Sequence, residues 1–148
     1  MNQRSDQRIV VIGGGIAGLE AALTLRATLP ESKLTIVSER DQLRLLPNLV
    51  YVPFGIQPEL VSAPISSILR DSNVDLMVGS TTGVDCASKT ITVGPKTVAY
   101  DALVVAPGVD HDSTPAHVVG SRDGALSLRA ALSELPTDRR TGIEVRVL

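Results

Sequence analysis

The sequence is poor in cysteine and in aromatic residues. Cys86 is the only cysteine among 148 residues, so the chain cannot form an intrachain disulfide or a Cys-x-x-Cys redox pair. Tryptophan is absent and there are only two tyrosines and one phenylalanine, so the core has to be built from aliphatic side chains. An aliphatic core suits a parallel sheet flanked by helices. We expect Cys86 to be a small, partly buried residue where a strand runs into a turn, with a reactive thiol as the alternative.

Basic clusters and long apolar runs are also lacking. The formal net charge is −2 without any basic block, and few aromatic rings could stack on bases, which argues against a nucleic-acid groove. The longest basic cluster, Arg139-Arg140, is interpreted as a solvated turn. No stretch approaches the roughly 18 apolar residues of a transmembrane helix, and the polar first eight residues do not resemble a signal peptide. We therefore expect a soluble, cytoplasmic protein without a transmembrane segment.

A glycine-rich turn is the most informative feature that is present. The apolar strand expected over residues 9–12 leads into Gly13, Gly15 and Gly18, at the G-x-G-x-x-G spacing of dinucleotide-binding turns. Gly13 permits a tight reversal, Gly15 lets the backbone approach a pyrophosphate, and Gly18 allows close packing of helix on strand. The free N–H groups of residues 15–18 can then point at phosphates, whose charge the helix dipole favours.

An acidic residue after the next strand predicts the ribose end of the same site. Glu39 lies 21 residues past Gly18, at the end of an apolar strand over residues 34–38, where it would accept hydrogen bonds from ribose hydroxyls. Its charge would repel a 2′-phosphate, so we expect FAD or NAD rather than a 2′-phosphorylated nucleotide. Glycine-rich helix starts also arise from packing alone, but the apolar strand before this turn and the helical spacing after it favour a nucleotide site.

The middle of the chain predicts a loop, a helix and a set of short strands. The apolar loop over residues 43–55 would cover either a ring system or the core. The helix, over residues 64–71, places Ile65, Ile68 and Leu69 on its apolar face. Closely spaced turn signals then predict an antiparallel meander of four strands, over residues 74–78, 83–86, 90–93 and 97–100.

The last third predicts a second buried strand and a helix. The strand begins at Asp101 and ends in a Pro-Gly turn at Gly108. The helix over residues 124–135 is capped by Asp123 or Ser121. Asp101 is interpreted as a structural residue at the strand start, with a catalytic base as the alternative.

Three segments together resemble the two-dinucleotide-binding-domain flavoproteins of the glutathione-reductase type. They are the glycine turn with Ser38-Glu39-Arg40, residues 74–84, and the run from Tyr100 to Gly108, which is similar to the family's YDxLVxATG element. Residues 46–55 and 63–70 look most like the sulfide:quinone reductases and the type II NADH dehydrogenases. The resemblance implies an α/β, Rossmann-like FAD-binding domain over residues 1–140, with a parallel sheet, flanking helices and an antiparallel meander.

The resemblance also implies FAD as the cofactor and a role for each residue that would bind it. The helix start would bind the pyrophosphate through Gly13, Gly15, Ile16, Ala17 and Gly18. Glu39 and Arg40, the two residues after the second strand, would bind the adenosine, and the backbone of Val84 would contact the adenine. A second turn, of Ala106, Pro107 and Gly108, would lie on the diphosphate side nearest the flavin. Pro107 stands where the family has threonine, which removes a hydroxyl and an N–H from that turn.

The two histidines and the catalytic chemistry are left without an assignment. His111 and His117 are interpreted as loop residues in solvent, with proton carriers near a flavin as the alternative. Their spacing is not a metal signature, so no metal is expected. The sequence identifies no catalytic residue.

The end of the chain bears on function. In the family the helix over residues 124–135 leads into an NADH-binding domain, and residues 141–148 resemble only its first strand, so we expect a truncated chain. The predicted function is the FAD-binding portion of an FAD-dependent NAD(P)H or sulfide:quinone oxidoreductase that needs a second polypeptide, self-association or the absent segment for turnover. NAD(P)H and quinone would react only if the missing part of the enzyme were supplied. The alternative is a non-catalytic nucleotide-binding or interaction module. Such a protein could lie at the inner face of the membrane as a peripheral protein.

Overall fold

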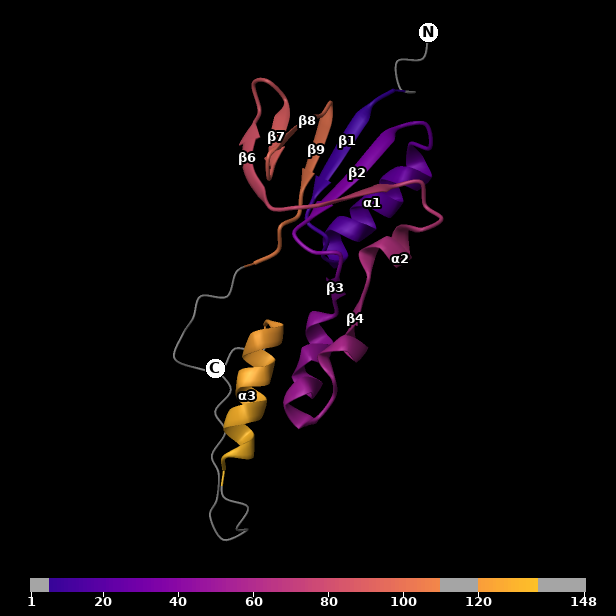
Figure 1. The fold of residues 1–148 in the computed structure, drawn as a ribbon. Helices are drawn as coiled ribbons and strands as arrows, with labels where there is room; N and C mark the ends of the chain where they lie inside the picture. Colours follow the sequence, from indigo (N-terminus) through magenta and orange to yellow (C-terminus); the bar gives the residue numbers. More distant parts are fainter. Residues whose placement is uncertain (1–5, 110–119, 136–148) are drawn as a thin grey trace. The chain divides into compact units, whose positions relative to one another are not determined.

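The computed structural model describes residues 6–109 and 120–135 (Figure 1). The described residues divide into two compact units, the first within Met1–Leu45 and Glu59–Asp110 and the second within Leu46–Pro58 and His111–Leu148. Every residue that the sequence predicts to bind a nucleotide belongs to the first unit. His111, His117 and residues 141–148 lie outside the described residues.

A parallel sheet forms the centre of the first unit. Its strands are β1 (Arg8–Ile12), β2 (Lys33–Ser38), β5 (Asp75–Val78) and β9 (Ala102–Val105), in the order β5-β2-β1-β9. The apolar residues of β1 and β2, Ile9–Ile12, Leu34, Ile36 and Val37, are buried because both faces of the sheet are covered. Ile12 pairs with both Val37 and Val105, so the carboxyl ends of neighbouring strands meet at one edge of the sheet.

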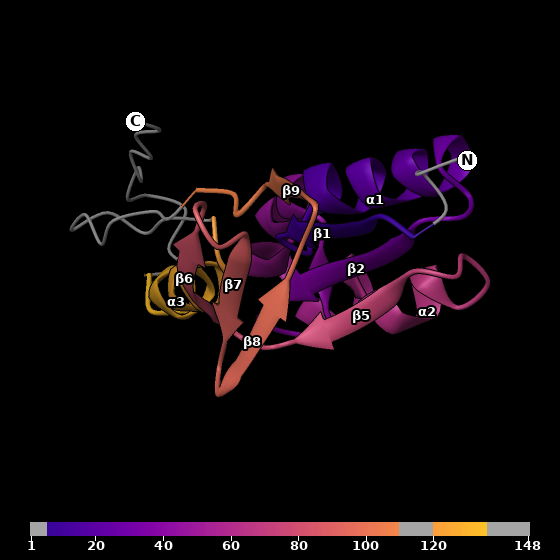
Figure 2. The same cartoon turned by 90° about the horizontal axis from the view of Figure 1, so that it is seen from above.

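The two faces of this sheet are covered by different layers. Alternate side chains of a strand point to opposite faces. On one face Ile9 and Val11 pack with Leu19 of helix α1 (Ile16–Thr28) and Ile65 of helix α2 (Ile65–Leu69). On the other face the core includes Ile91 of an antiparallel meander, whose strands are β6 (Thr81–Asp85), β7 (Thr90–Val93) and β8 (Lys96–Ala99). Figures 1 and 2 show helices α1 and α2 on the side of the parallel sheet opposite the meander.

The meander has fewer strands than the sequence predicts. The prediction that residues 74–78 begin it is wrong, because β5 pairs in parallel with β2. Helix α2 precedes β5, and a strand–helix–strand connection returns the chain to the same sheet in parallel orientation. The other three predicted strands form the antiparallel sheet of β6, β7 and β8.

Three further predictions need correction. Strand β9 is half-buried rather than buried, since it is an edge strand of the four-stranded sheet and Val105 is 60% exposed. Cys86 is exposed because it lies in the turn after β6. Helix α2 is shorter than predicted, since Pro64 is extended with ψ 128°, and Ile68 lies on its exposed side rather than its core side.

The segment predicted as a loop over residues 43–55 is largely regular. It begins with β3 (Leu43–Arg44), which pairs antiparallel with β4 (Ser62–Ala63), and continues as the 3-10 helix η1 (Leu46–Phe54). A second short 3-10 helix, η2, covers Pro58–Val61.

The second unit consists of η1 and helix α3 (Arg122–Ser133), which pack against each other. Ser121, one of the two predicted caps, accepts a hydrogen bond from the Gly124 N–H at 3.0 Å. The helix begins two residues earlier than predicted. The buried side chains of η1 are Leu49, Val52 and Pro53, so these serve a core, whereas Leu46, Val50, Tyr51 and Phe54 are exposed. That the exposed set covers a ring system stays a prediction.

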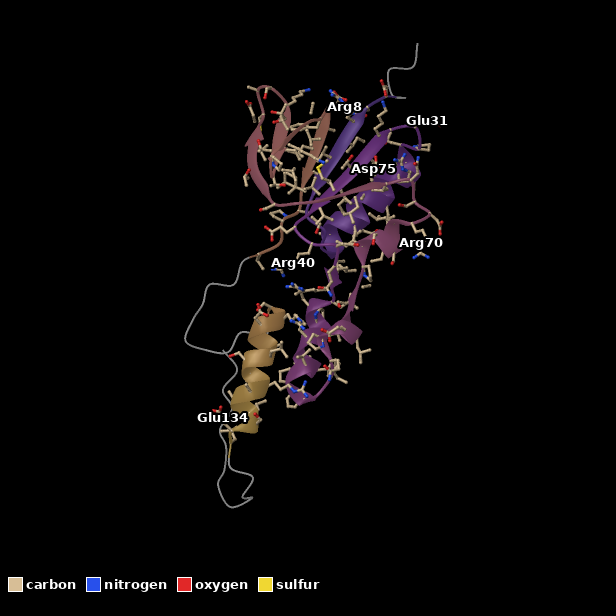
Figure 3. The ribbon with its side chains drawn as sticks, viewed as in Figure 1. Arg8, Glu31, Arg40, Arg70, Asp75 and Glu134 are labelled. Atoms are coloured by element: carbon tan, nitrogen blue, oxygen red, sulfur yellow. The ribbon has the colours of Figure 1, made fainter. Side chains whose placement is uncertain are left out.

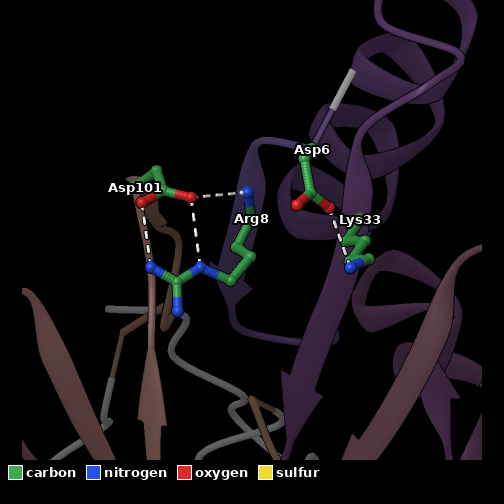
Figure 4. Close-up of polar contacts among 4 residues, drawn as sticks. All are labelled: Asp6, Arg8, Lys33 and Asp101. Carbon is green, nitrogen blue, oxygen red and sulfur yellow. Dashed lines mark hydrogen bonds and ion pairs between the residues drawn. The ribbon is translucent and has the colours of Figure 1, made fainter. Parts of the chain in front are cut away.

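Ion pairs lie at the amino end of the parallel sheet. The Asp101 carboxylate accepts hydrogen bonds from the Arg8 N–H at 2.8 Å, Nε at 3.1 Å and Nη2 at 3.0 Å (Figure 4). These bonds hold the pKa of Asp101 at about 2. Lys33 pairs with Asp6 at 2.8 Å beside them. Asp101 is therefore a structural residue of the strand start, as predicted, and is not at the edge where the predicted nucleotide-binding residues lie.

Candidate functional site

The first glycine of the turn is required by a close approach between β1 and β9. Gly13 has φ +114°, and a Cβ added there would lie 1.9 Å from the carbonyl oxygen of Ala106. The Gly13 N–H donates to the Val37 carbonyl at 2.8 Å, and the Ala106 N–H donates to the Ile12 carbonyl at 2.7 Å. The glycine turn and the predicted second turn, 93 residues apart in sequence, are therefore in direct contact.

Two more glycines fit the turn closely against its surroundings. A Cβ at Gly18 would lie 1.8 Å from the Gly13 carbonyl oxygen, so only glycine lets α1 start this close to the strand. A Cβ at Gly14 would lie 2.3 Å from Ser38 Oγ and 2.6 Å from Ile65 Cδ1. Gly14 is not in the G-x-G-x-x-G spacing and was not among the predicted site residues, although the run of three glycines signals it.

Gly15 differs from the other three glycines, since a Cβ added there would meet no protein atom within 4 Å. Gly15 is the N-cap of α1, no side chain caps that helix end, and its first turn carries no acidic residue. The next two residues, Ile16 and Ala17, are exposed, Ile16 by 56%. The first N–H groups of a helix have no partner within it and attract anions. The turn therefore has open space where the predicted pyrophosphate would approach.

The ribose end of the site lies after β2 at the same edge of the sheet. Glu39 and Arg40 are both exposed, and Figure 3 shows Arg40 at the end of the sheet opposite Arg8. Ser80 Oγ donates a hydrogen bond to Glu39 Oε1 at 3.2 Å. The adjacent Gly79 N–H donates to the Ser38 carbonyl at 2.8 Å. Ser80 was not predicted, because no spacing rule connects it with an acid 41 residues earlier.

The predicted adenine contact lies on β6. Val84 is four residues past Ser80 and pairs with Ile91 of β7. Strand β6 is an edge strand of the three-stranded sheet, so the backbone groups on its outer side are not paired within that sheet. Such an edge fits a predicted contact made through backbone rather than through a side chain.

The second predicted turn follows β9. Ala106 is half-buried against Gly13, while Pro107 and Gly108 are exposed. Gly108 has φ +82°, and a Cβ there would meet no atom within 4 Å. This turn therefore leaves its backbone accessible beside the glycine turn.

Other site chemistries find no support among the described residues. In residues 6–109 and 120–135 there is no group of three or more His, Cys, Asp or Glu side chains that could hold a metal ion. Within the same ranges no helix is both long enough and apolar enough to cross a membrane.

Comparison with known proteins identifies the family. Residues 7–137 match the pyridine nucleotide-disulphide oxidoreductase family. The chain belongs to this family. The members of this family are FAD-binding flavoproteins, in agreement with the cofactor and the Rossmann-like fold that the sequence predicts.

Relatives of this pyridine nucleotide-disulphide oxidoreductase chain include two quinone enzymes. A sulfide-quinone reductase from Aquifex aeolicus is 31% identical over 104 residues, which is 69% of this chain and 24% of the relative. A type II NADH:quinone oxidoreductase from Mycobacterium tuberculosis is 31% identical over 138 residues, 84% of this chain and 29% of that protein. The solved structure of the Aquifex aeolicus sulfide:quinone oxidoreductase matches with a TM-score of 0.81 at 26% identity, over 90% of this chain and 33% of the other. The chain thus spans about a quarter to a third of the length of these relatives.

Proposed function

We propose that this chain is the FAD-binding portion of an FAD-dependent NAD(P)H or sulfide:quinone oxidoreductase. The observation that carries the proposal is the open space at Gly15, at an uncapped helix start, between glycines whose own Cβ positions are filled by protein atoms. Packing alone explains Gly13 and Gly18, but it does not explain a glycine at position 15. A diphosphate at the helix start does, because its oxygens would occupy the space that a side chain would fill.

The proposed roles follow the edge of the sheet. The backbone around Gly13, Gly15, Ile16, Ala17 and Gly18 holds the pyrophosphate. Glu39 accepts hydrogen bonds from the ribose, with Arg40 beside it, and the backbone of Val84 meets the adenine. The turn of Ala106, Pro107 and Gly108 lies on the diphosphate side nearest the flavin. Contact between Gly13 and Ala106 supports a continuous surface from one turn to the other.

The reaction itself rests on the relatives. Bound FAD supplies an electron-accepting isoalloxazine ring, while protein residues bind and orient it. Both named relatives act on a quinone, which is therefore the proposed electron acceptor, with NAD(P)H or sulfide as donor. We assign residues 1–140 to the FAD-binding domain and residues 141–148 to the first strand of an NADH-binding domain. Turnover would need the rest of such an enzyme, from a second polypeptide, self-association or further sequence, and a peripheral position at the inner membrane face would suit quinone access.

The direct test is the absorbance spectrum of the purified protein, with mass identification of any molecule released on denaturation. We expect a flavin spectrum and release of FAD, or uptake of added FAD. A ligand at 100 times its dissociation constant stabilises the folded state by about 2.7 kcal/mol, which is a shift of about 5 to 10 °C for a chain of this size. A colourless protein whose melting temperature is unchanged by FAD, ADP and NAD would refute the proposal.

A turnover assay distinguishes a non-catalytic nucleotide-binding module from the FAD-binding portion of an enzyme. The module would take up FAD yet oxidise neither NADH nor sulfide, even when mixed with candidate partner chains. The enzyme portion would reduce a quinone once its partner is supplied.

A further inference from the structure

Asp41 binds the start of helix α2 from a distance in sequence. Its Oδ1 accepts a hydrogen bond from the Ser66 N–H at 2.8 Å, and its Oδ2 accepts one from Ser66 Oγ at 2.5 Å. The residue before the helix, Pro64, contributes no side-chain cap. These bonds favour the charged carboxylate and lower the pKa of Asp41. Asp41 therefore serves as the side-chain cap that α2 does not have in its own sequence.

The same carboxylate lies at the end of the segment that presents Glu39 and Arg40. Within this segment Ser38 Oγ donates to the Arg40 carbonyl at 2.8 Å. Just beyond it, Gln42 Nε2 donates to Ser62 Oγ at 2.9 Å, and β3 pairs with β4. The chain that leaves β2 is therefore held to residues 62–66. Of these contacts the Asp41–Ser66 pair is nearest in sequence to Glu39, which Ser80 also contacts directly.

Helix α2 is itself fixed beside the glycine turn. Ile65, the residue before Ser66, is fully buried in the core, and its Cδ1 would lie 2.6 Å from a Cβ at Gly14. On the same side, Ser38 Oγ lies next to Gly14. A well-packed helix start thus lies between the turn at the predicted pyrophosphate and the loop at the predicted ribose.

We propose that Asp41 is a positioning residue for ribose recognition: by binding Ser66 it holds the Glu39 loop at a fixed distance from the glycine turn. The inference rests on the proposed nucleotide site. Asp41 does not contact the ribose in this proposal; it acts through Glu39, whose hydrogen bonds to the two ribose hydroxyls need the loop in one position.

The experiment compares two ligands that differ only in those hydroxyls. ADP and 2′,3′-dideoxy-ADP are titrated calorimetrically into the full chain after removal of bound nucleotide by dialysis. The variants are D41A and S66A, with D75A as a control that removes an equal charge from the start of β5. In D41A we expect the dissociation constant of ADP to rise about tenfold, which corresponds to the loss of one charge-assisted hydrogen bond between the ribose and Glu39. The dissociation constant of dideoxy-ADP should change less than twofold. S66A, which keeps the N–H donor, should show the same selectivity with a smaller loss.

Two further measurements separate positioning from general damage. In the double variant E39A/D41A, ADP should bind no more weakly than in E39A alone, because the two residues act through one contact. The D75A control should bind both ligands like the parent. Equal losses for both ligands in D41A and S66A, or additive losses in the double variant, would overturn the inference while leaving the nucleotide site intact. Absence of ADP binding to the parent chain would instead overturn the proposed function.

Discussion

Replacing Gly15 by alanine should separate nucleotide binding from folding. The added methyl group meets no protein atom within 4 Å, and Gly15 has φ −78°, which alanine adopts freely. Alanine is a poorer N-cap than glycine, but it lowers the entropy of the unfolded chain, so the two effects oppose each other. The net change in the free energy of unfolding should stay within about 1 kcal/mol, a melting shift of at most about 4 °C.

The effect on ligand stabilisation should be much larger. At an FAD concentration 100 times its dissociation constant, the parent gains about 2.7 kcal/mol. If the methyl group occupies the space of a pyrophosphate oxygen and weakens binding about 100-fold, the same FAD concentration stabilises the G15A variant by only about 0.4 kcal/mol. Differential scanning fluorimetry with and without FAD measures both quantities in one plate.

G13A is the matched comparison, because its methyl group would lie 1.9 Å from the Ala106 carbonyl oxygen at a φ of +114°. Backbone strain of about 1–3 kcal/mol and a similar overpacking term together predict a loss of about 2–6 kcal/mol, enough to lower the melting temperature by at least about 4 °C without any ligand. A G15A variant with the parental FAD shift, or a G13A variant with the parental melting temperature, would refute the geometry argued here.

Three other changes have defined outcomes. I36A, in a fully buried position of β2, should lower the free energy of unfolding by about 2–5 kcal/mol in urea titrations. S80A should weaken ADP binding several-fold by releasing Glu39, with an unchanged melting temperature; an unchanged dissociation constant would count against that role. For D101N, the carboxylate paired with Arg8 has a folded pKa of about 2 against an ordinary value of 3.8. Its stabilisation is therefore complete above about pH 5 and lost as pH falls toward 2, so parent and D101N should differ at pH 7 and converge at low pH.

The elements that sequence predicts correctly are those whose signal is local. Strand β1 is apolar from Ile9 to Ile12 and runs directly into glycine, and Ser121 caps α3 three residues before its hydrogen-bond donor. The wrong predictions concern partners that are distant in sequence. The pairing of β5 depends on α2 bringing the chain back beside β2, and the exposure of Cys86 depends on where the β6 turn ends.

The candidate site follows the same division. The spacing of Gly13, Gly15 and Gly18, with an acid after the next strand, is a local pattern that the sequence displays in full. This pattern does not include Ser80 or Asp41, because their partners are distant in sequence. Ser80 contacts Glu39, 41 positions earlier, and Asp41 contacts Ser66, 25 positions later. A serine or an aspartate carries no spacing signal of its own, so only the folded chain reveals such contacts.

The pairing of β1 with β9 has a consequence for how the protein matures. The glycine turn is encoded near the amino terminus, yet the carbonyl that lies against it belongs to Ala106. A chain emerging from the ribosome therefore cannot complete this surface until Ala106, 93 residues after Gly13, has been synthesised. A nucleotide that contacts both turns would therefore stabilise the docking of β9 beside β1.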